Sequence, residues 1–270
     1  MLKTRILTAM ILAGILLAGL FLLPPLAAAA AFGAVFTIGA WEWSGFGGVT
    51  GMGTRLAYAG GVALLLLLAW EWTAVPANLL LLLRVACLWW VISLLWLTVA
   101  PLQHRPALAL LCGVPVLVPA CIALARLLTA TRGFARGPQI VLWLVLLVIA
   151  SDIGAYFAGR RFGKRKLAPR VSPGKTWEGA LGGLAMTALV AWGGAAYFGL
   201  PPLEALAFGC GVGVFSIVGD LTESMFKRAA GLKDSGRLLP GHGGLLDRID
   251  SVTAAAPLYA LGLFGSGVIK

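Results

Sequence analysis

The sequence contains few charged residues. Asp, Glu, Lys and Arg together make up 11% of its 270 residues, whereas soluble domains carry about 25%. This small share excludes a disordered chain, a coiled coil and a conventional nucleic-acid-binding domain. Hydrophobic residues reach 60%, which is more apolar surface than a soluble core can hide. The composition therefore predicts a polytopic integral membrane protein.

Cysteines are scarce and scattered. Each of the four stands alone in an apolar stretch, and the sequence has no CxxC pair; they are Cys87, Cys112, Cys121 and Cys210. This spacing gives neither a zinc-ligand pattern nor a disulfide framework. We therefore expect the cysteines to pack as small side chains inside the protein or against lipid.

Acidic residues are fewer than basic ones. The chain has 10 acids and 21 bases, which gives a formal net charge of +11. The bases are spread among long apolar runs. Basic loops beside membrane helices follow from the cytoplasmic bias of Lys and Arg and from attraction to anionic lipid headgroups. We therefore expect a membrane environment and no nucleic-acid partner.

Long apolar windows recur along the chain. A membrane-spanning helix needs about 20 mostly apolar residues, and Pro or Gly punctuation separates the windows. The windows cover residues 6–23, 26–41, 56–73, 85–101, 107–125, 138–159, 180–199, 203–221 and 252–269. We expect an all-α fold of about nine transmembrane helices.

The amino-terminal window has two interpretations. Lys3 and Arg5 precede its apolar run, and Pro24-Pro25 with an alanine stretch follows it, which also describes a secretory signal peptide. Because further membrane windows follow, we favour an uncleaved first span.

Lys3 and Arg5 indicate a cytoplasmic amino terminus, since Lys and Arg favour the inner face. Counting windows from there places Arg105 and the 160–175 loop on the same side. One loop departs from this bias, because the count leaves it outside; it contains Arg126, Arg132 and Arg136.

Charge is concentrated in one stretch. Residues 151–250 contain 12 of the 21 Lys and Arg residues and 8 of the 10 Asp and Glu residues. We therefore expect residues 1–135 to form a membrane scaffold and residues 136–270 to form a catalytic membrane region. No linker separates the two, so we expect one integrated domain.

The run from Gly219 to Asp250 carries the most charge at the edges of apolar windows. Asp220, Glu223, Ser224 and Lys227 fall at helical positions i, i+3, i+4 and i+7, so they share one face. We expect this helix to end near Gly231, a common carboxyl-terminal cap residue. A polar loop follows. The alternative interpretation is a juxtamembrane helix with solvated ion pairs and a flexible loop.

Carboxylates and bases in this run indicate phosphoryl or nucleotidyl transfer. Asp220 with Asp247, helped by Asp250 or Asp152, offers the hard oxygen ligands that magnesium takes when it also holds substrate phosphates. Bases of the same run supply donors for those phosphates; they are Lys227, Arg228, Lys233 and Arg248. His242 stands among glycines and can bind phosphate or transfer a proton.

Two further motifs lie upstream. The run Ser172 to Gly179 contains Gly-Lys-Thr, which resembles the end of a P-loop. A P-loop also needs a glycine five residues before Gly174, but that position is Pro169. We instead expect a glycine turn that presents Lys175, with hydroxyls at Ser172 and Thr176, at a helix start that favours anions. A plain loop and helix cap is the alternative.

The run Ser151 to Tyr156 places Asp152 inside the 138–159 apolar window. An ionisable group at that depth is costly and is usually paired or functional. A buried pairing role and a substrate or metal role both stay open for Asp152.

The run from Ser224 to Asp250 resembles the signature of the phosphatidate cytidylyltransferase, or CDP-diacylglycerol synthase, family. The positions that carry the resemblance are Ser224, Lys227-Arg228, Lys233-Asp234, Gly236, Pro240, His242-Gly243-Gly244 and Asp247-Arg248-Ile249-Asp250. Residues 151–156 and 172–179 are similar to further motifs of that family. Thr222 departs from the pattern, where an apolar residue is expected.

The resemblance implies a membrane enzyme that joins CTP and phosphatidic acid into CDP-diacylglycerol and pyrophosphate, with magnesium as cofactor. It implies metal binding by Asp220 and Asp247 and catalytic roles for these two, Lys227 and His242. It implies substrate contacts by Ser172, Lys175, Thr176, Ser224, Arg228, Lys233, Asp234, Arg248, Asp250 and Asp152. It also implies a homodimer in the cell's inner membrane, with the active site facing the cytoplasm.

Three alternatives remain. One is a cytidylyltransferase that acts on an ether-lipid phosphate. A second is a CDP-alcohol phosphotransferase, but its compact run of several Asp residues with Gly and Ala is absent. The third is an organic-anion transporter, which favours broken helices in two matching halves, whereas the charges here gather in one stretch.

Overall fold

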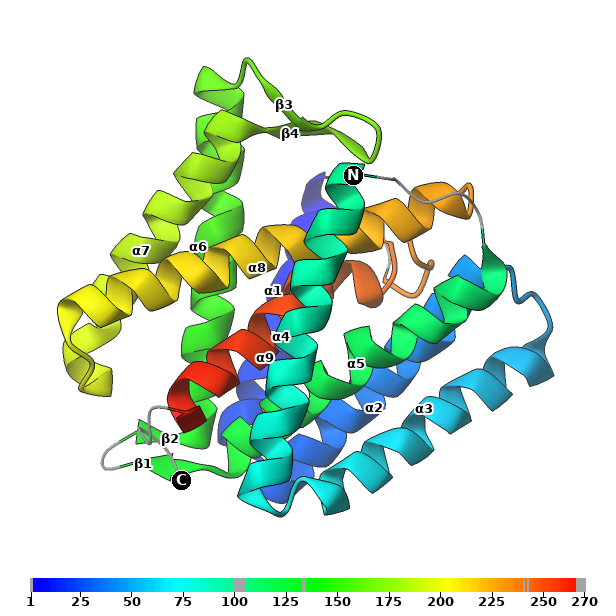
Figure 1. Cartoon of the computed structure of the whole chain (residues 1–270), viewed down its shortest axis with the longest axis horizontal. Coiled ribbons are helices and arrows are strands. Elements are labelled where there is room, and N and C mark those ends of the chain that lie inside the picture. Colours follow the sequence, from blue (N-terminus) through cyan, green and yellow to red (C-terminus); the bar gives the residue numbers. More distant parts are fainter. Residues whose placement is uncertain (1, 100–104, 133–134, 240, 242, 266–270) are drawn as a thin grey trace.

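The computed structural model describes residues 2–99, 105–132, 135–239, 241 and 243–265. Helices dominate these residues, as Figure 1 shows. The α-helices are α1 (Leu2–Phe21), α2 (Pro25–Trp43), α3 (Met52–Trp72), α4 (Pro76–Val99), α5 (Pro106–Thr129), α6 (Gly137–Phe162), α7 (Trp177–Phe198), α8 (Pro202–Ala229) and α9 (Asp250–Gly265). Two short 3-10 helices are η1 (Ser44–Gly47) and η2 (Leu246–Arg248).

Each apolar window of the sequence falls on one of these helices, which confirms the all-α prediction. Within the described residues, seven helices, α2 to α8, are long and apolar enough to cross a membrane. The apolar part of α1 and the 16-residue α9 are shorter. The span count of nine is therefore approximate, and the chain is a multi-pass membrane protein.

Two small hairpins interrupt the helices, and the sequence patterns predicted neither. Strands β1 (Thr131–Arg132) and β2 (Ala135–Arg136) pair antiparallel before α6. Strands β3 (Lys166–Ala168) and β4 (Ser172–Thr176) pair antiparallel between α6 and α7, with a register irregularity between Lys166 and Ala168. Ser172 to Thr176 is thus a strand rather than the expected glycine turn.

Helix α5 is at the centre of the bundle. Protein buries 67% of its apolar window but only 17% of that of α3. Two side chains tie neighbouring helices to its backbone: Trp43 Nε1 donates to the Ala109 carbonyl oxygen at 2.7 Å, and Tyr58 Oη donates to that of Leu110 at 2.8 Å. Such polar side chains hold helices together where water is absent.

Helices α6 and α7 approach each other closely. A Cβ atom on Gly182 would lie 2.2 Å from the Cβ of Ala158, and one on Gly154 would lie 2.5 Å from the Gly182 carbonyl oxygen. Small residues permit this separation in membrane helices. The contact places the end of α6 beside the β4 strand that leads into α7.

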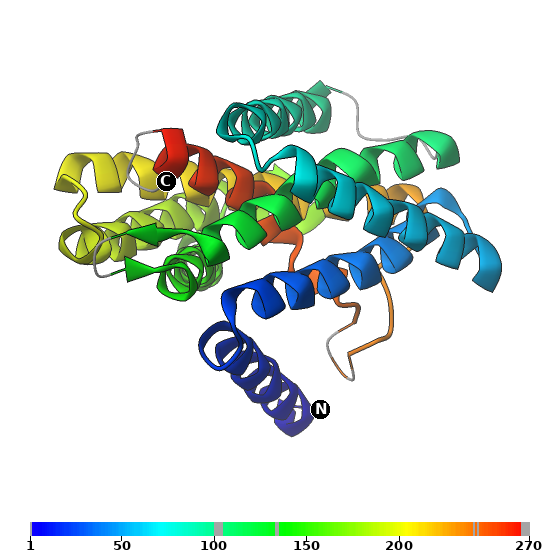
Figure 2. The same ribbon diagram turned by 90° about the horizontal axis from the view of Figure 1, so that it is seen from below.

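Helix α6 spans the molecule from one hairpin to the other. Figure 1 shows β1–β2 at its lower end and β3–β4 at its upper end. Figure 2 shows the loop after α8 beside the carboxyl end of α2. The end of α2 and the loop after α8, which are far apart in sequence, therefore lie side by side.

The division of the chain at residue 135 falls in the β1–β2 hairpin. Helices on both sides of it pack together, with α4 and α5 against α9 and α4 against α8. The scaffold role of residues 1–135 stays a prediction.

Candidate active site

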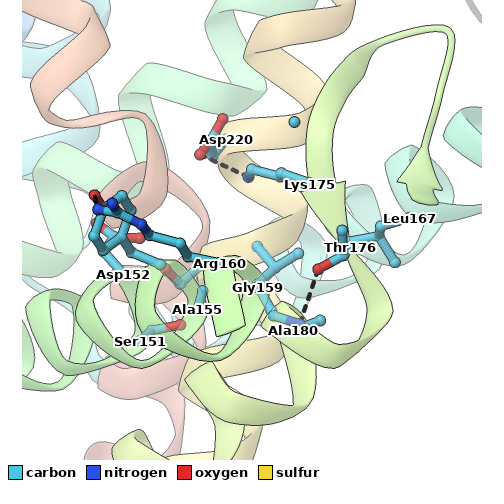
Figure 3. Close-up of a pocket in the computed structure, with 15 residues that line it drawn as sticks. Ser151, Asp152, Ala155, Gly159, Arg160, Leu167, Lys175, Thr176, Ala180 and Asp220 are labelled. Atoms are coloured by element: carbon cyan, nitrogen blue, oxygen red, sulfur yellow. Dashed lines mark hydrogen bonds and ion pairs between the residues drawn. The ribbon is translucent and has the colours of Figure 1, made fainter. Parts of the chain in front are cut away.

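A cavity of about 420 Å³ lies where α6, β4, α7 and α8 meet. Figure 3 shows Asp152 on α6, Lys175 on β4 and Asp220 on α8 around it. Its polar lining comprises Ser151, Asp152, Tyr156, Arg160, Lys175, Thr176, Ser216 and Asp220. Polar and charged groups from three elements therefore converge on one cavity inside a mostly apolar protein.

The start of α7 fixes one wall of this cavity. Thr176 caps the helix, because its Oγ1 accepts a hydrogen bond from the Gly179 amide at 3.1 Å. The Glu178 carboxylate accepts from the amides of Lys164 and Arg165 at 3.1–3.2 Å. Together these bonds hold β3–β4 against α7, so the position of Lys175 is fixed by the backbone on either side.

An ion pair crosses the cavity wall. Lys175 Nζ lies 2.6 Å from Asp220 Oδ2, and Figure 3 shows the two side chains meeting between β4 and α8. Ser224, one turn further along α8, donates to Asp220 Oδ1 at 3.2 Å. Both members of the pair are partly exposed, so an anionic ligand can reach Lys175.

The expected face of α8 is present. The helix ends at Ala229, and Gly231 follows with φ +71°, as the sequence predicted. The Leu232 amide closes the turn by donating to the Lys227 carbonyl oxygen at 2.8 Å. This end places Lys227 where the following loop folds back on it.

A buried charge cluster forms at that point. Lys227 Nζ lies 3.1 Å from Glu223 Oε1 and 2.6 Å from Asp247 Oδ1. All three side chains are less than 10% exposed. One ammonium group therefore faces two carboxylates away from water, and removal of Lys227 leaves both carboxylates without a cation.

Asp247 also organises the loop that carries it. Its Oδ2 accepts from the amides of Ser235 at 2.9 Å and Gly244 at 2.8 Å. Burial alone would raise the pKa of Asp247, but the ammonium of Lys227 and these two amides outweigh it. The pKa of Asp247 consequently lies below its ordinary value, and the carboxylate is ionised at neutral pH.

Asp250 begins α9 beside the same helix. Gly219 permits the approach, since a Cβ there would lie 2.5 Å from the Asp250 carbonyl oxygen. Desolvation, followed by the neighbouring charge of Asp220, raises the pKa of Asp250 to about 8. The charges of Lys227 and Lys175 oppose this rise.

The structure distributes the predicted site residues over three places. Asp152, Lys175, Thr176 and Asp220 line the cavity. Ser224, Lys227, Asp247 and Asp250 lie around the adjoining part of α8. A third group is exposed and comprises Arg228, Lys233, Asp234 and Arg248. Of these, Arg248 acts electrostatically on Asp152 at the cavity.

Two predicted residues fall elsewhere. Ser172 belongs to β4 and pairs with Ala168, and it is not among the described residues that line the cavity. His242 lies outside the described residues.

Sequence reasoning missed several contributors. Glu223 was recognised on the shared helical face but not as a partner of Lys227. Ser151 and Ser216 line the cavity as buried hydroxyls, and Arg160 lines it from the last turn of α6. Two features of the sequence could have indicated Ser151 and Arg160: the first is a serine next to Asp152, and the second is a basic residue two helical turns beyond it.

The donors present fit magnesium in their chemistry. Asp220 and Asp152 supply hard oxygen atoms at the cavity, and magnesium typically takes one or two carboxylates together with substrate phosphates. Asp247 has three of its acceptor sites engaged by Lys227 and two amides. In the part of the chain that the structure describes, no three His, Cys, Asp or Glu residues are placed to hold one metal ion.

Replacing Lys227 with Met should destabilise the protein strongly. The change leaves Glu223 and Asp247 buried without their shared cation, and breaking a buried pair costs about 3–5 kcal/mol. We expect the melting temperature in detergent to fall by several degrees. The exposed neighbour provides the control, and Arg228→Met should melt close to the wild type; equal melting of the two variants would contradict the buried cluster.

Comparison with known proteins matches this arrangement to one family. Residues 3–264 match the model of the Cytidylyltransferase family. A phosphatidate cytidylyltransferase of Pseudomonas aeruginosa is 44% identical over 278 residues, covering 99% of this chain and 98% of that protein. One of Haemophilus influenzae is 42% identical over 282 residues, covering 96% and 98%. One of Brucella suis is 49% identical over 134 residues, covering 47% and 46%.

The family match covers both the helices before residue 135 and the charged region after it. The resemblance of the Ser224 to Asp250 run is therefore confirmed at the level of the whole sequence. The chain belongs to the cytidylyltransferase family.

Proposed function

We propose that this protein is a phosphatidate cytidylyltransferase, which converts CTP and phosphatidic acid into CDP-diacylglycerol and pyrophosphate. The observation that carries the proposal is the charged cavity between α6, β4 and α8, which contains Lys175 paired with Asp220. The two relatives that align over nearly their full length are both named phosphatidate cytidylyltransferase. A cavity lined by cations suits the phosphate groups of an anionic lipid and of a nucleoside triphosphate.

The reaction needs no protein nucleophile. A phosphate oxygen of phosphatidic acid attacks the α-phosphorus of CTP, the bond to the β-phosphate breaks, and pyrophosphate leaves. The protein contributes by positioning two anions and by neutralising their charge. Lys175 and Arg160 are cations at the cavity that can bind phosphate oxygens.

Lys175 has a second task in this proposal. In the absence of substrate its ammonium is neutralised by Asp220 at 2.6 Å. A phosphate that binds Lys175 replaces the carboxylate and releases Asp220 for another partner. Substrate entry therefore exchanges the Lys175–Asp220 ion pair for a pair between Lys175 and phosphate, and it frees the Asp220 carboxylate to bind a cation.

Magnesium belongs to the proposal as a cofactor. When bound, it would supply charge neutralisation for the substrate phosphates. We propose that Asp220, which lines the cavity, and Asp247 would hold it, Asp247 by exchanging one of the donors that now contact it, which are Lys227, Ser235 and Gly244. Asp152 and Asp250 are the neighbouring carboxylates that support them.

The same proposal places the protein in the inner membrane with the cavity on the cytoplasmic side, where CTP is available. Lys3 and Arg5 support this orientation through the positive-inside bias. We also propose that two copies associate, as the family resemblance implies.

Incubation of the detergent-purified protein with CTP, phosphatidic acid and magnesium tests the activity. We expect release of pyrophosphate and formation of CDP-diacylglycerol, with an isoprenoid ether-lipid phosphate as a parallel substrate arm. If product is no higher than in a no-enzyme control, the proposal is wrong. If only the ether lipid gives product, the protein is a cytidylyltransferase for that lipid instead.

Replacing Lys175 with Met should lower turnover at least tenfold. A charge-assisted hydrogen bond contributes about 1.5–3 kcal/mol, and about 1.4 kcal/mol is a factor of ten. The measurement is initial rate at saturating CTP. Arg170→Met, an exposed change in the same β3–β4 segment, is the control and should keep the wild-type rate. A normal rate for Lys175→Met would show that the Ser172 to Gly179 run has only a structural role, as a loop and helix cap.

Replacing Asp220 with Asn should raise the magnesium concentration needed for half-maximal rate. An amide oxygen is a weaker ligand than a carboxylate for a hard dication. Turnover across a magnesium titration, beside thermal melting in the same detergent, is the measurement. Unchanged magnesium dependence together with a lowered melting temperature would show that Asp220 is only a counter-ion for Lys175.

Labelling of single cysteines tests the orientation. In a background without Cys87, Cys112, Cys121 and Cys210, Leu238→Cys lies on the exposed loop after α8. We expect an impermeant maleimide to label it only after the inner face is opened. Glu204→Cys at the other end of α8 is the matched control and should react in intact cells. The reverse pattern would invert the topology.

A further inference from the structure

One acidic residue of the amino-terminal half is buried against the loop of the charged region. Glu42 lies at the carboxyl end of α2 and is 4% exposed. Figure 2 shows this end of α2 beside the loop that follows α8. A buried carboxylate in a membrane protein is costly unless donors satisfy it.

The loop supplies those donors. Glu42 Oε2 accepts from the Leu246 amide at 2.7 Å and from Ser235 Oγ at 3.2 Å. Its Oε1 accepts from the Leu245 amide at 3.1 Å. The partners are about 200 positions away in sequence, so α2 and the loop are joined only by folding.

Glu42 and Asp247 hold the same backbone from two sides. Ser235 donates its amide to Asp247 and its hydroxyl to Glu42. The Gly244 amide goes to Asp247, while the next two amides go to Glu42. A shift of the loop away from Glu42 therefore also shifts the donors that orient the Asp247 carboxylate.

The fit leaves no space for larger residues. A Cβ on Gly236 would lie 2.2 Å from Glu42 Oε1, and one on Gly244 would lie 2.6 Å from Glu42 Oε2. The side chain thus contacts the loop backbone directly rather than through water. The neighbouring Trp43 packs on Phe226, with ring centroids 5.1 Å apart, one residue before Lys227. The end of α2 therefore contacts both the loop and the helix that Asp247 and Lys227 join.

We propose that Glu42 is a positioning residue for the transfer reaction. Its carboxylate fixes the chain at Ser235 and at Leu245–Leu246, so that Asp247 keeps its orientation toward Lys227 and the phosphates. This inference rests on the proposed function, because it concerns the same site. Glu42 acts through the loop and does not touch the substrates.

A carboxylate suits this position better than its amide. Three donors converge on two oxygen atoms, and only an ionised carboxylate accepts with both. A glutamine keeps the size and one acceptor, but its NH₂ group then faces N–H or O–H donors. Glu42→Gln consequently changes the hydrogen bonds of the loop without leaving a cavity.

Steady-state kinetics of Glu42→Gln tests the proposal. We expect kcat to fall tenfold or more, while KM for CTP and for phosphatidic acid changes less than threefold, since the loop orients charge but does not bind either substrate through Glu42. Glu204→Gln, an exposed change on α8, is the matched control and should keep kcat. A normal kcat in Glu42→Gln, or a loss confined to melting temperature, would overturn the proposal.

Ser235→Ala provides a second route that leaves Glu42 intact. It removes only the hydroxyl that Glu42 accepts, and we expect a smaller fall in kcat, of about threefold. In the double variant kcat should be no lower than in Glu42→Gln alone, because both changes release the same segment. Independent, multiplicative losses would show that Glu42 does not act through the loop.

If Glu42→Gln fails to fold, Ser235→Ala alone decides, and a kcat equal to the wild type then overturns the proposal. Absence of CDP-diacylglycerol with the wild-type protein would instead refute the proposed function. In that case maleimide labelling of Leu238→Cys still tests the loop contact, and an unchanged labelling rate in the Glu42→Gln background would refute it.

Discussion

The buried contact of Lys227 with two carboxylates is the interaction on which the site depends. Glu223 comes from the same helix, and Asp247 comes from the loop 20 residues further on. Their shared ammonium compensates charges that the surrounding apolar helices cannot. This contact brings the loop back to α8, and the amides of Ser235 and Gly244 then complete the shell of Asp247.

From this cluster the site extends along α8 to the cavity. Asp220 lies two turns before Lys227 on the same helix, and Lys175 reaches it from β4. Gly219 on α8 allows the first residue of α9, Asp250, to approach α8 closely. The site is thus assembled from helix ends, where backbone amides and charged side chains are available beside the membrane.

Local patterns were sufficient to predict much of this arrangement. Apolar windows predicted the helices, and the spacing from Asp220 to Lys227 with Gly231 beyond predicted the charged face and the end of α8. The β3–β4 hairpin was not predicted, because its strands are only 3 and 5 residues long and one contains Pro and Gly, which strands disfavour. The partner of Asp220 was not predictable from helical spacing either, since Lys175 comes from another element.

The contact between Glu42 and the loop was beyond local patterns for a different reason. Glu42 is one of two acids outside residues 151–250, and nothing near it in sequence indicates a partner. Its donors are mostly backbone amides, which every residue except proline carries. Only the folded arrangement of α2 against the loop selects which amides it meets.

The hydrogen bonds of Glu42 also define which parts of the chain can be exchanged between relatives. The charged region looks modular, and some relatives align with less than half of this chain. Yet the loop of that region is completed by an acid from the second helix. A chimera that joins the halves near residue 135 therefore combines two surfaces that must match, and its first half must present a carboxylate at the end of α2 to keep these hydrogen bonds.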